Sequence, residues 1–215
     1  MLQNDIGTGK DKIEFYSSGF NPHGMTYGAW TVRWWKWFFS IERGRNPVFD
    51  LTGQYANEKQ SEPTWFLAGT WVSEQRRFPL RKCVIPCGVS ILFPVLNCEV
   101  NPLEYPHLKS KEGLKKHILS DRSTIGKLEC FVNEMELPPQ LVDSDPEFFP
   151  IKLRGDLSEN GSSGNTTMTA SGYWIFIKTL PEGIHRLSFE GSYQYGKLYS
   201  GARYKISVQE SATSN

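Results

Sequence analysis

The residues of this chain that are best suited to chemistry follow an apolar segment, 89–96, which is apolar on both faces of a predicted strand. Asn97 and Glu99 come directly after it, and strand alternation places them on one face. A carboxyl group at the mouth of an apolar core loses hydration, which raises its pKa and suits it to proton transfer. The sequence therefore predicts Glu99 as a general acid or base and Asn97 as the group that orients or polarises a substrate. The simpler alternative is that Glu99 is the first exposed residue after a strand.

A second carboxylate, Asp50, lies in the segment NPVFDLTG. Asp50 with Thr52 and Gly53 has the chemistry of an Asx turn, in which the carboxylate accepts hydrogen bonds from backbone N–H groups two residues on. This structural role is the favoured interpretation. If Asp50 instead converged with Glu99, the two carboxyl groups could serve as acid and base, as in glycoside hydrolysis. Asp50 is therefore the candidate catalytic partner.

The element that must support these residues is a segment, 26–41, that holds four of the seven tryptophans. Its apolar residues recur at helical spacing, so we expect a helix over 26–43 that begins at Thr26 and ends near Gly44 and Pro47. The apolar face covers more than half of the circumference, which is typical of a helix embedded against a sheet. A narrow polar stripe is expected to face water: Ala29, Arg33, Lys36 and Ser40.

Four side chains could line a ligand pocket. Trp35 lies at the edge of the apolar face of the helix, and Trp65, Gln60 and Thr70 lie on or beside the next predicted strand. Indole rings stack on ligands, and an aromatic pocket with a few polar groups is the usual small-molecule site. The alternative for each is core packing or turn chemistry.

The rest of the chain is rich in short β segments bounded by Gly, Pro, Asn or Ser. Many strands with only one further helix, 111–119 capped by Ser110, predict a mainly β fold: a two-sheet, jelly-roll-like β-sandwich with an embedded Trp-rich helix. We expect an N-terminal arm (1–25), a single domain (26–210) and a flexible tail (211–215). The predicted strands are 64–72, 82–85, 89–96, 128–132, 149–153, 166–170, 173–179, 184–191 and 203–208, with a hairpin turn at Asn133-Glu134.

Charge and composition exclude several classes of protein. A net charge of +1 gives no electrostatic reason for nucleic-acid binding, and no apolar run is long enough to span a membrane. The N-terminus lacks the pattern of a signal peptide, so we expect a cytoplasmic protein, or an exported one if a leader was removed. Free thiols are favoured over disulfides for the four cysteines, Cys83, Cys87, Cys98 and Cys130.

No metal or cofactor is expected. The four histidines are scattered without paired spacing, and no complete cofactor motif or nucleophile motif is present. His185 lies within a predicted strand, where a structural histidine with both ring nitrogens satisfied is the favoured interpretation.

Several of these segments together resemble a family of uncharacterised microbial proteins. The resemblance spans about residues 27–191. It implies a shared fold, and because the family has no established activity it implies no mechanism. Many relatives carry a cysteine in the stretch matching 54–59, which has none here, and this fits a reducing location. The matching residues are Tyr27-Gly28, Trp30, Trp34-Trp35, Trp37, Asn46-Pro47, Asp50, Thr52-Gly53, Gln60, Pro63, 65–70, Cys83, Pro86, Gly88, Phe93-Pro94, Leu96-Asn97, Glu99, 172–174, Gly183, His185, Phe189 and Gly191.

The leading hypothesis is a protein that processes a small molecule, of hydrolase type, with Glu99, Asp50 and Asn97 as catalytic residues and Trp35 or Trp65 stacking on the substrate. The alternative is a non-catalytic β-sandwich module that binds a carbohydrate or an aromatic ligand. A third alternative is a structural protein in which Trp35 and Phe39 pack against a second copy in a homo-oligomer.

Overall fold

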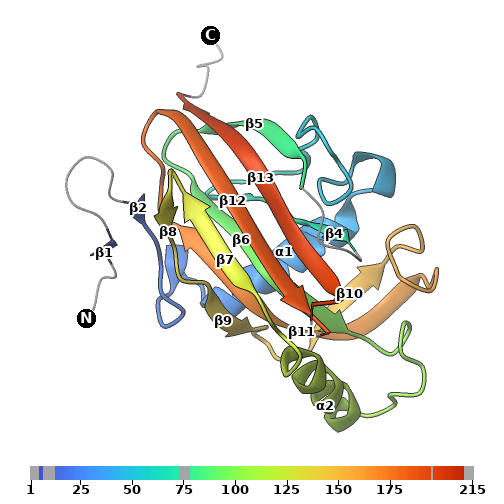
Figure 1. Ribbon diagram of the computed structural model, residues 1–215. Coiled ribbons are helices and arrows are strands. Elements are labelled where there is room, and N and C mark those ends of the chain that lie inside the picture. Colours follow the sequence, from blue (N-terminus) through green and yellow to red (C-terminus); the bar gives the residue numbers. More distant parts are fainter. Residues whose placement is uncertain (1–4, 7–12, 73–77, 195, 211–215) are drawn as a thin grey trace.

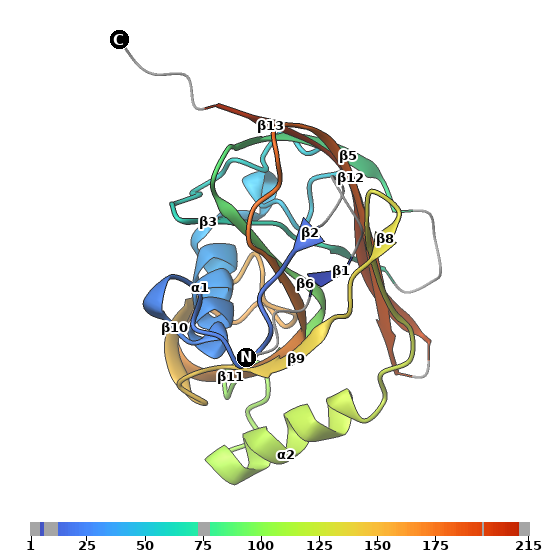
Figure 2. The same cartoon turned by 90° about the vertical axis from the view of Figure 1, so that its left-hand side faces the viewer.

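The computed structural model describes residues 5–6, 13–72, 78–194 and 196–210. Two β-sheets pack face to face, and helix α1 (Tyr27–Ser40) covers the outer face of one of them (Figures 1 and 2). The predicted class, a mainly β two-sheet fold with an embedded Trp-rich helix, is confirmed. The predicted tail, 211–215, and residues 1–4 and 7–12 of the predicted arm lie outside the described residues.

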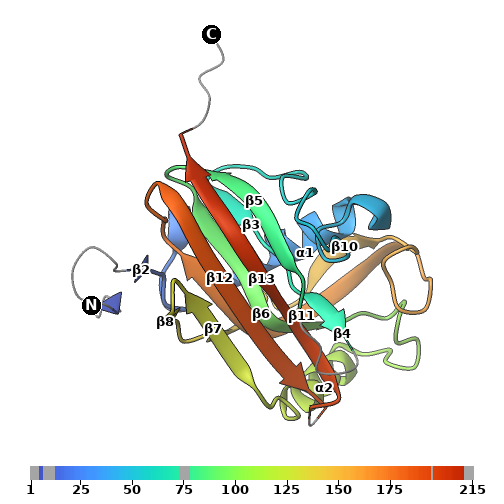
Figure 3. The same ribbon diagram turned by 45° about the horizontal axis from the view of Figure 1, so that its top comes forward.

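Sheet I carries α1, and sheet II forms the opposite wall (Figure 3). The strands of sheet I run in the order β10 (Phe149–Leu153), β11 (Gly164–Ile177), β6 (Ser90–Val100) and β3 (Thr64–Phe66), with β9 (Gln140–Asp143) also paired to β11. Those of sheet II run in the order β4 (Thr70–Val72), β13 (Leu198–Gln209), β12 (Gly183–Tyr193), β7 (Leu128–Val132) and β8 (Met135–Glu136), with β5 (Leu80–Pro86) parallel to β13. A small ribbon pairs β1 (Asp5–Ile6) with β2 (Ile13–Glu14).

Strand β6, as the sequence predicts for 89–96, and β11 from Met168 onward are buried on both faces. Ile91 and Phe93 belong to the core between the sheets, where the ring of Phe93 stacks 4.8 Å from that of Phe189 on β12. Leu92 and Phe176 belong to the core beneath α1. Both faces of sheet I are thus shielded from water along the middle of β6, and the polar residues Asn97 and Glu99 lie at its end.

Helix α1 begins as predicted and ends earlier than predicted. Thr26 Oγ1 accepts a hydrogen bond from Ala29 N at 3.1 Å, and Arg33, Lys36 and Ser40 are exposed. The helix ends at Ser40 because Asn46 Nδ2 donates to the carbonyl oxygens of two residues of the last turn and C-cap, Phe38 and Ile41. This side chain supplies the cap that the sequence analysis assigned to a later glycine.

The prediction of a single strand over 64–72 is wrong, because this segment forms two strands in different sheets. β3 pairs with β6 in sheet I, and β4 pairs with β13 in sheet II. The chain crosses over at residues 67–69, where Gly69 lies so close to β13 that a Cβ would sit 2.8 Å from Ser200 Oγ. A crossing between sheets leaves the alternation of apolar residues intact, so the pattern alone does not reveal it.

Strand β6 extends beyond its apolar part to Val100. Asn97 and Glu99 therefore lie inside the strand, paired with Gly172 and Ala170 of β11, and do not follow it. The two predicted segments 166–170 and 173–179 are likewise one strand, β11. Gly172 permits this because a Cβ there would sit 2.7 Å from Leu96 O.

Helix α2 (Lys111–Arg122) lies across one end of the molecule, below both sheets in Figure 2. Ser110 Oγ accepts from Gly113 N at 3.0 Å, so the predicted cap is confirmed. Leu114 and Ile118 are buried against Val100 at the end of β6. None of the described helices is both long and apolar enough to cross a membrane.

Three smaller predictions also hold. The β7–β8 hairpin turns at Asn133 and Glu134, whose φ angles of 48° and 70° are those of a primed turn. Both ring nitrogens of His185 are satisfied, by Asn133 Nδ2 at 2.9 Å and by Pro181 O at 2.8 Å. All four cysteines are free thiols.

Candidate functional site

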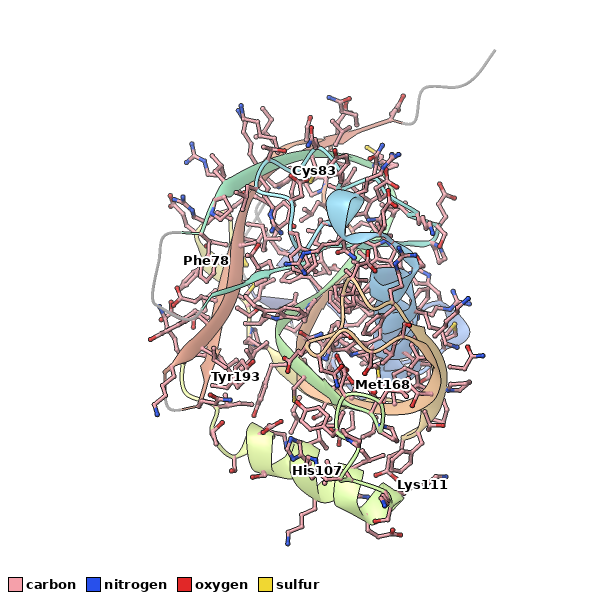
Figure 4. The ribbon with its side chains drawn as sticks, turned by 90° about the vertical axis from the view of Figure 1, so that its right-hand side faces the viewer. Phe78, Cys83, His107, Lys111, Met168 and Tyr193 are labelled. Carbon is pink, nitrogen blue, oxygen red and sulfur yellow. The ribbon has the colours of Figure 1, made fainter. Side chains whose placement is uncertain are left out.

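A cavity of about 420 Å³ opens at the end of the molecule where β6 leaves sheet I. Its walls come from α1, the end of β6, α2 and the β12–β13 hairpin; Figure 4 faces this end, with Tyr193 on the sheet II side and α2 below. The volume is in the range of small-molecule sites, about 300–1,000 Å³. The lining residues are Trp35, Phe38, Phe39, Trp71, Asn97, Cys98, Glu99, Glu104, Tyr105, His117, Asp121, Leu157, Glu159, Tyr193, Gln194 and Leu198.

The centre of the cavity is a pair of carboxyl groups, Glu99 and Glu104, joined by Asn101. The buried Asn101 forms an Asx turn in which its Oδ1 accepts from Leu103 N at 3.0 Å and Glu104 N at 3.1 Å. That turn reverses the chain after β6 and brings Glu104 back to Glu99. Asn101 Nδ2 then donates to Glu99 Oε2 at 3.0 Å and also to Glu104 Oε2. One amide nitrogen therefore holds both carboxyl groups together.

The surroundings of Glu99 favour its protonated form. Burial raises the pKa of Glu99 well above its usual range, and a hydrogen bond with Glu104 and the charge of Glu104 raise it further. The hydrogen bond from Asn101 opposes this rise. Burial and the neighbouring carboxyl group of Glu104 together therefore favour a proton on Glu99.

Two more acidic side chains surround this pair. Glu159 is exposed at the rim, and its backbone N–H donates to Glu104 Oε1 at 2.8 Å. Asp121 reaches the cavity from α2, with its Oδ2 3.7 Å from His117 Nε2. Burial raises the pKa of both acids; Glu104 and Asp121 raise that of Glu159 further, whereas His117 lowers that of Asp121. No Lys or Arg occurs among the described residues that line the cavity.

Two buried N–H donors in the cavity wall have no hydrogen-bond partner in the described part of the chain: Asn97 Nδ2 and Trp35 Nε1. The exposed fractions of the two side chains are only 6% and 2%. A buried donor left unpaired costs about 1–3 kcal/mol, so an acceptor atom that reached either group would lower the free energy of the site.

Aromatic rings form much of the remaining wall. The rings of Trp35 and Phe39 stack with centroids 6.1 Å apart, and Trp71 meets Phe38 edge-on at 5.9 Å. Tyr105 lies 4.7 Å from the ring of His117. Trp35 and Phe39 are already 2% and 4% exposed in the single chain, so they offer little surface to a second subunit.

The structure does not bring Asp50 to this cavity. Asp50 is buried in its own loop, where Oδ1 accepts from Thr52 N and Thr52 Oγ1, both at 2.8 Å, and Oδ2 accepts from Tyr55 N at 2.9 Å. Burial alone would raise the pKa of Asp50, but the hydrogen bonds from Tyr55, Thr52 and Gly53 outweigh it and lower the pKa. The geometry is that of the Asx turn expected from the sequence, and Glu104 occupies the place beside Glu99.

Three further residues considered for ligand binding hold the fold together and are not among the lining residues. The Gln60 amide donates to Ala56 O and Phe66 O and accepts from Phe66 N. Thr70 Oγ1 donates to Val48 O at 2.9 Å and accepts from a buried guanidinium, that of Arg81. Trp65 packs against the core between the sheets. Of the predicted site residues, the structure brings together Glu99, Asn97 and Trp35.

Sequence reasoning missed Glu104, Glu159, Asp121 and His117. His117 and Asp121 are four residues apart and share a face of α2, but the predicted helix, 111–119, ended before Asp121. Glu104 lies three residues after Asn101, the spacing of an Asx turn, yet nothing local shows that this turn faces Glu99. Among the described residues, no group of three or more His, Cys, Asp or Glu is arranged to hold a metal ion.

Comparison of the chain with protein-family models, with curated proteins and with solved structures found no match. The resemblance noted from the sequence therefore stays an expectation, and the function must be argued from the cavity itself.

Proposed function

We propose that this cavity binds a small molecule and that the Glu99–Glu104 pair catalyses hydrolysis of an acyl bond. The observation that carries the proposal is the pair itself: two carboxyl groups on one amide donor, in a cavity with unpartnered N–H groups. One ionised and one protonated carboxyl group can act together, since the first takes a proton from water while the second gives one to a carbonyl oxygen.

The chemistry balances as a simple hydrolysis. A water oxygen adds to the carbonyl carbon as one carboxylate accepts its proton, and the other carboxyl group protonates the carbonyl oxygen. When the tetrahedral intermediate collapses, the bond from carbon to the leaving oxygen or nitrogen breaks, and the protonated carboxyl group gives its proton to the leaving group. One hydroxyl of the intermediate returns its proton to the carboxylate as the carbonyl re-forms, so the pair again holds one proton. Asn97 Nδ2 and Trp35 Nε1 are the donors available to the carbonyl oxygen as it gains charge.

The contact between the two acids favours acyl hydrolysis over glycoside hydrolysis. Glycosidases hold their two carboxyl groups about 5–9.5 Å apart, on either side of the scissile bond. Glu99 and Glu104 instead accept from the same amide nitrogen, that of Asn101, which places their carboxyl groups side by side as in a dyad that activates one water.

The test is a turnover assay of the purified chain on a panel of chromogenic esters, lactones, amides and glycosides. Glu99→Gln and Glu104→Gln should each lower kcat by about 10²–10⁴-fold on any substrate found, because each removes a proton-transfer group. Glu136→Gln, at an exposed position of β8 that does not line the cavity, is the matched control and should leave kcat unchanged. Full activity in Glu99→Gln would remove the proposed role of the pair.

The second candidate, a non-catalytic binding module, is favoured by the aromatic wall around Trp35. It predicts that a ligand changes tryptophan fluorescence and raises the melting temperature, while the whole panel shows no turnover. A ligand with that behaviour would replace the hydrolase proposal with this one.

A further inference from the structure

The ionisable side chains that line the cavity are almost all acidic. Four acidic side chains reach it, Glu99, Glu104, Asp121 and Glu159, and the one basic side chain among the described lining residues is His117. No Lys or Arg of the described chain forms an ion pair with Glu99, Glu104 or Glu159, whereas acids elsewhere on the surface pair with Lys or Arg, as Glu147 does with Lys115 at 2.6 Å. Uncompensated carboxylates in a partly desolvated cavity attract a cationic ligand.

The aromatic wall is of the kind that binds organic cations. Trp71 is 39% exposed, and Tyr105 and Tyr193 are half-buried at the opening. A cation over the face of Trp or Tyr is stabilised by the ring, and quaternary ammonium groups are bound in aromatic cages of this composition. A small hydrated metal ion gains little from such faces, so the wall selects an organic cation.

The unpartnered donors specify a second feature of the ligand. Asn97 Nδ2 and Trp35 Nε1 can give hydrogen bonds but cannot accept them, and both lie deep in the wall. They call for an acceptor oxygen at the inner end of the ligand. Glu159, in contrast, is exposed at the rim, so a positive group further out would meet a carboxylate there.

We propose that the ligand of this cavity is an organic ammonium compound that also carries an acceptor oxygen, of the class of amino alcohols and their esters. The acceptor oxygen lies against Asn97 and Trp35, and the ammonium group lies among the aromatic faces and the carboxylates of Glu104 and Glu159. As a statement about the substrate, this rests on the proposed function; as a statement about binding, it stands on the cavity alone.

The test compares two probes of nearly the same shape, choline and its neutral carbon isostere 3,3-dimethylbutan-1-ol, by tryptophan fluorescence and calorimetry. Choline should bind about tenfold tighter or better, since a cation–π contact in a desolvated site is worth about 1–2 kcal/mol. Ethanolamine forms a further arm: if it binds tighter than choline, the carboxylates select a primary ammonium, and if weaker, the aromatic faces select a quaternary one. Equal binding of choline and the isostere, or no binding of either ammonium probe, overturns the proposal.

Variants locate the effect. Glu159→Gln should weaken ammonium binding severalfold and leave the binding of the neutral isostere unchanged; because Glu159 is exposed, this change should not affect folding. Glu104→Gln should do the same, with the melting temperature measured as a check because Glu104 also holds the loop at Glu159. Glu136→Gln is again the control. If Glu159→Gln and Glu104→Gln both bind choline like the unmodified chain, the cavity is not the ammonium site.

The two proposals fail in different ways. Selective ammonium binding without turnover of amino-alcohol esters would leave the binding inference standing and remove the hydrolase. Turnover of neutral esters with no preference for the ammonium probes would keep the hydrolase and remove the ammonium ligand.

Discussion

Asp50 and Glu99 are both carboxyl groups withdrawn from water, yet their surroundings are opposite in kind. Asp50 accepts hydrogen bonds from three N–H and O–H groups of its own loop, and its pKa is lowered. Glu99 meets one amide donor and the carboxyl group of Glu104, and its pKa is raised. At Asp50 the donors outweigh the effect of burial on the pKa, whereas at Glu99 burial and the neighbouring Glu104 outweigh the one donor.

The comparison separates a structural acid from a candidate catalytic one. A carboxylate surrounded by backbone N–H groups is ionised, fixed and unable to take part in proton transfer. A carboxyl group that shares a proton with a second acid, in a cavity open to a ligand, can give and take protons. The indoles of α1 differ in a similar way: Trp34 Nε1 donates to Leu67 O at 2.8 Å, whereas the buried Nε1 of Trp35, a residue that lines the cavity, has no partner among the described residues.

The largest effect is expected from breaking the Asp50 loop. Asp50→Ala should lower the free energy of unfolding by about 3 kcal/mol, because it leaves backbone donors of a buried turn unpaired. Glu99→Gln should change it by less than about 1 kcal/mol at pH 5, because it keeps the shape and removes a group that is costly to ionise. Urea denaturation of the two variants measures both values. A larger loss for Glu99→Gln than for Asp50→Ala would reverse the assignment of the two roles.

The two tryptophans provide a matched pair with a smaller effect. Trp34→Phe and Trp35→Phe delete the same atoms from the same helix. Only the first leaves a hydrogen-bond acceptor, Leu67 O, without its donor. Trp34→Phe should therefore cost about 1–2 kcal/mol more than Trp35→Phe in the free energy of unfolding. Chemical denaturation measures the difference, and equal losses would show that Trp35 Nε1 is satisfied in the folded protein.

The smallest effects concern pH. A carboxyl group with a raised folded-state pKa binds more protons in the native than in the unfolded chain, so its contribution makes stability fall as pH rises above the ordinary Glu pKa, about 4.3. Glu99, Asp121 and Glu159 share this sign. Asp50 has the opposite sign: its stabilisation is present above the ordinary Asp pKa, about 3.9, and is lost as pH falls through its lowered value.

The urea concentrations at the midpoint of unfolding, measured from pH 3 to pH 8, test both pH dependences. Glu99→Gln should flatten the decline in stability above about pH 4.3, and Asp50→Asn should flatten the loss of stability at acid pH. If Glu99→Gln leaves the profile unchanged, Glu99 ionises normally and the shared proton is absent.

Much of the fold could be predicted from the sequence because it depends on local patterns. The cap at Thr26, the cap at Ser110, the hairpin at Asn133 and the doubly buried part of β6 each depend on residues within a few positions of one another. The division of 64–72 between two sheets could not be predicted, because apolar and polar residues alternate in the same way on either side of the crossing. The length of β6 was missed because polar residues inside a strand look like its end.

By itself the sequence determined the main elements, the two-sheet class and three of the side chains that meet in the cavity, because burial patterns and caps are short-range properties. Only the tertiary structure decided which acid lies beside Glu99. Asp50 is held in its own turn, Glu104 returns through the Asn101 turn, and Asp121 arrives when α2 packs against Val100. Whether a carboxyl group keeps its proton depends on these neighbours within a few ångströms, and neighbours distant in the chain are set by packing.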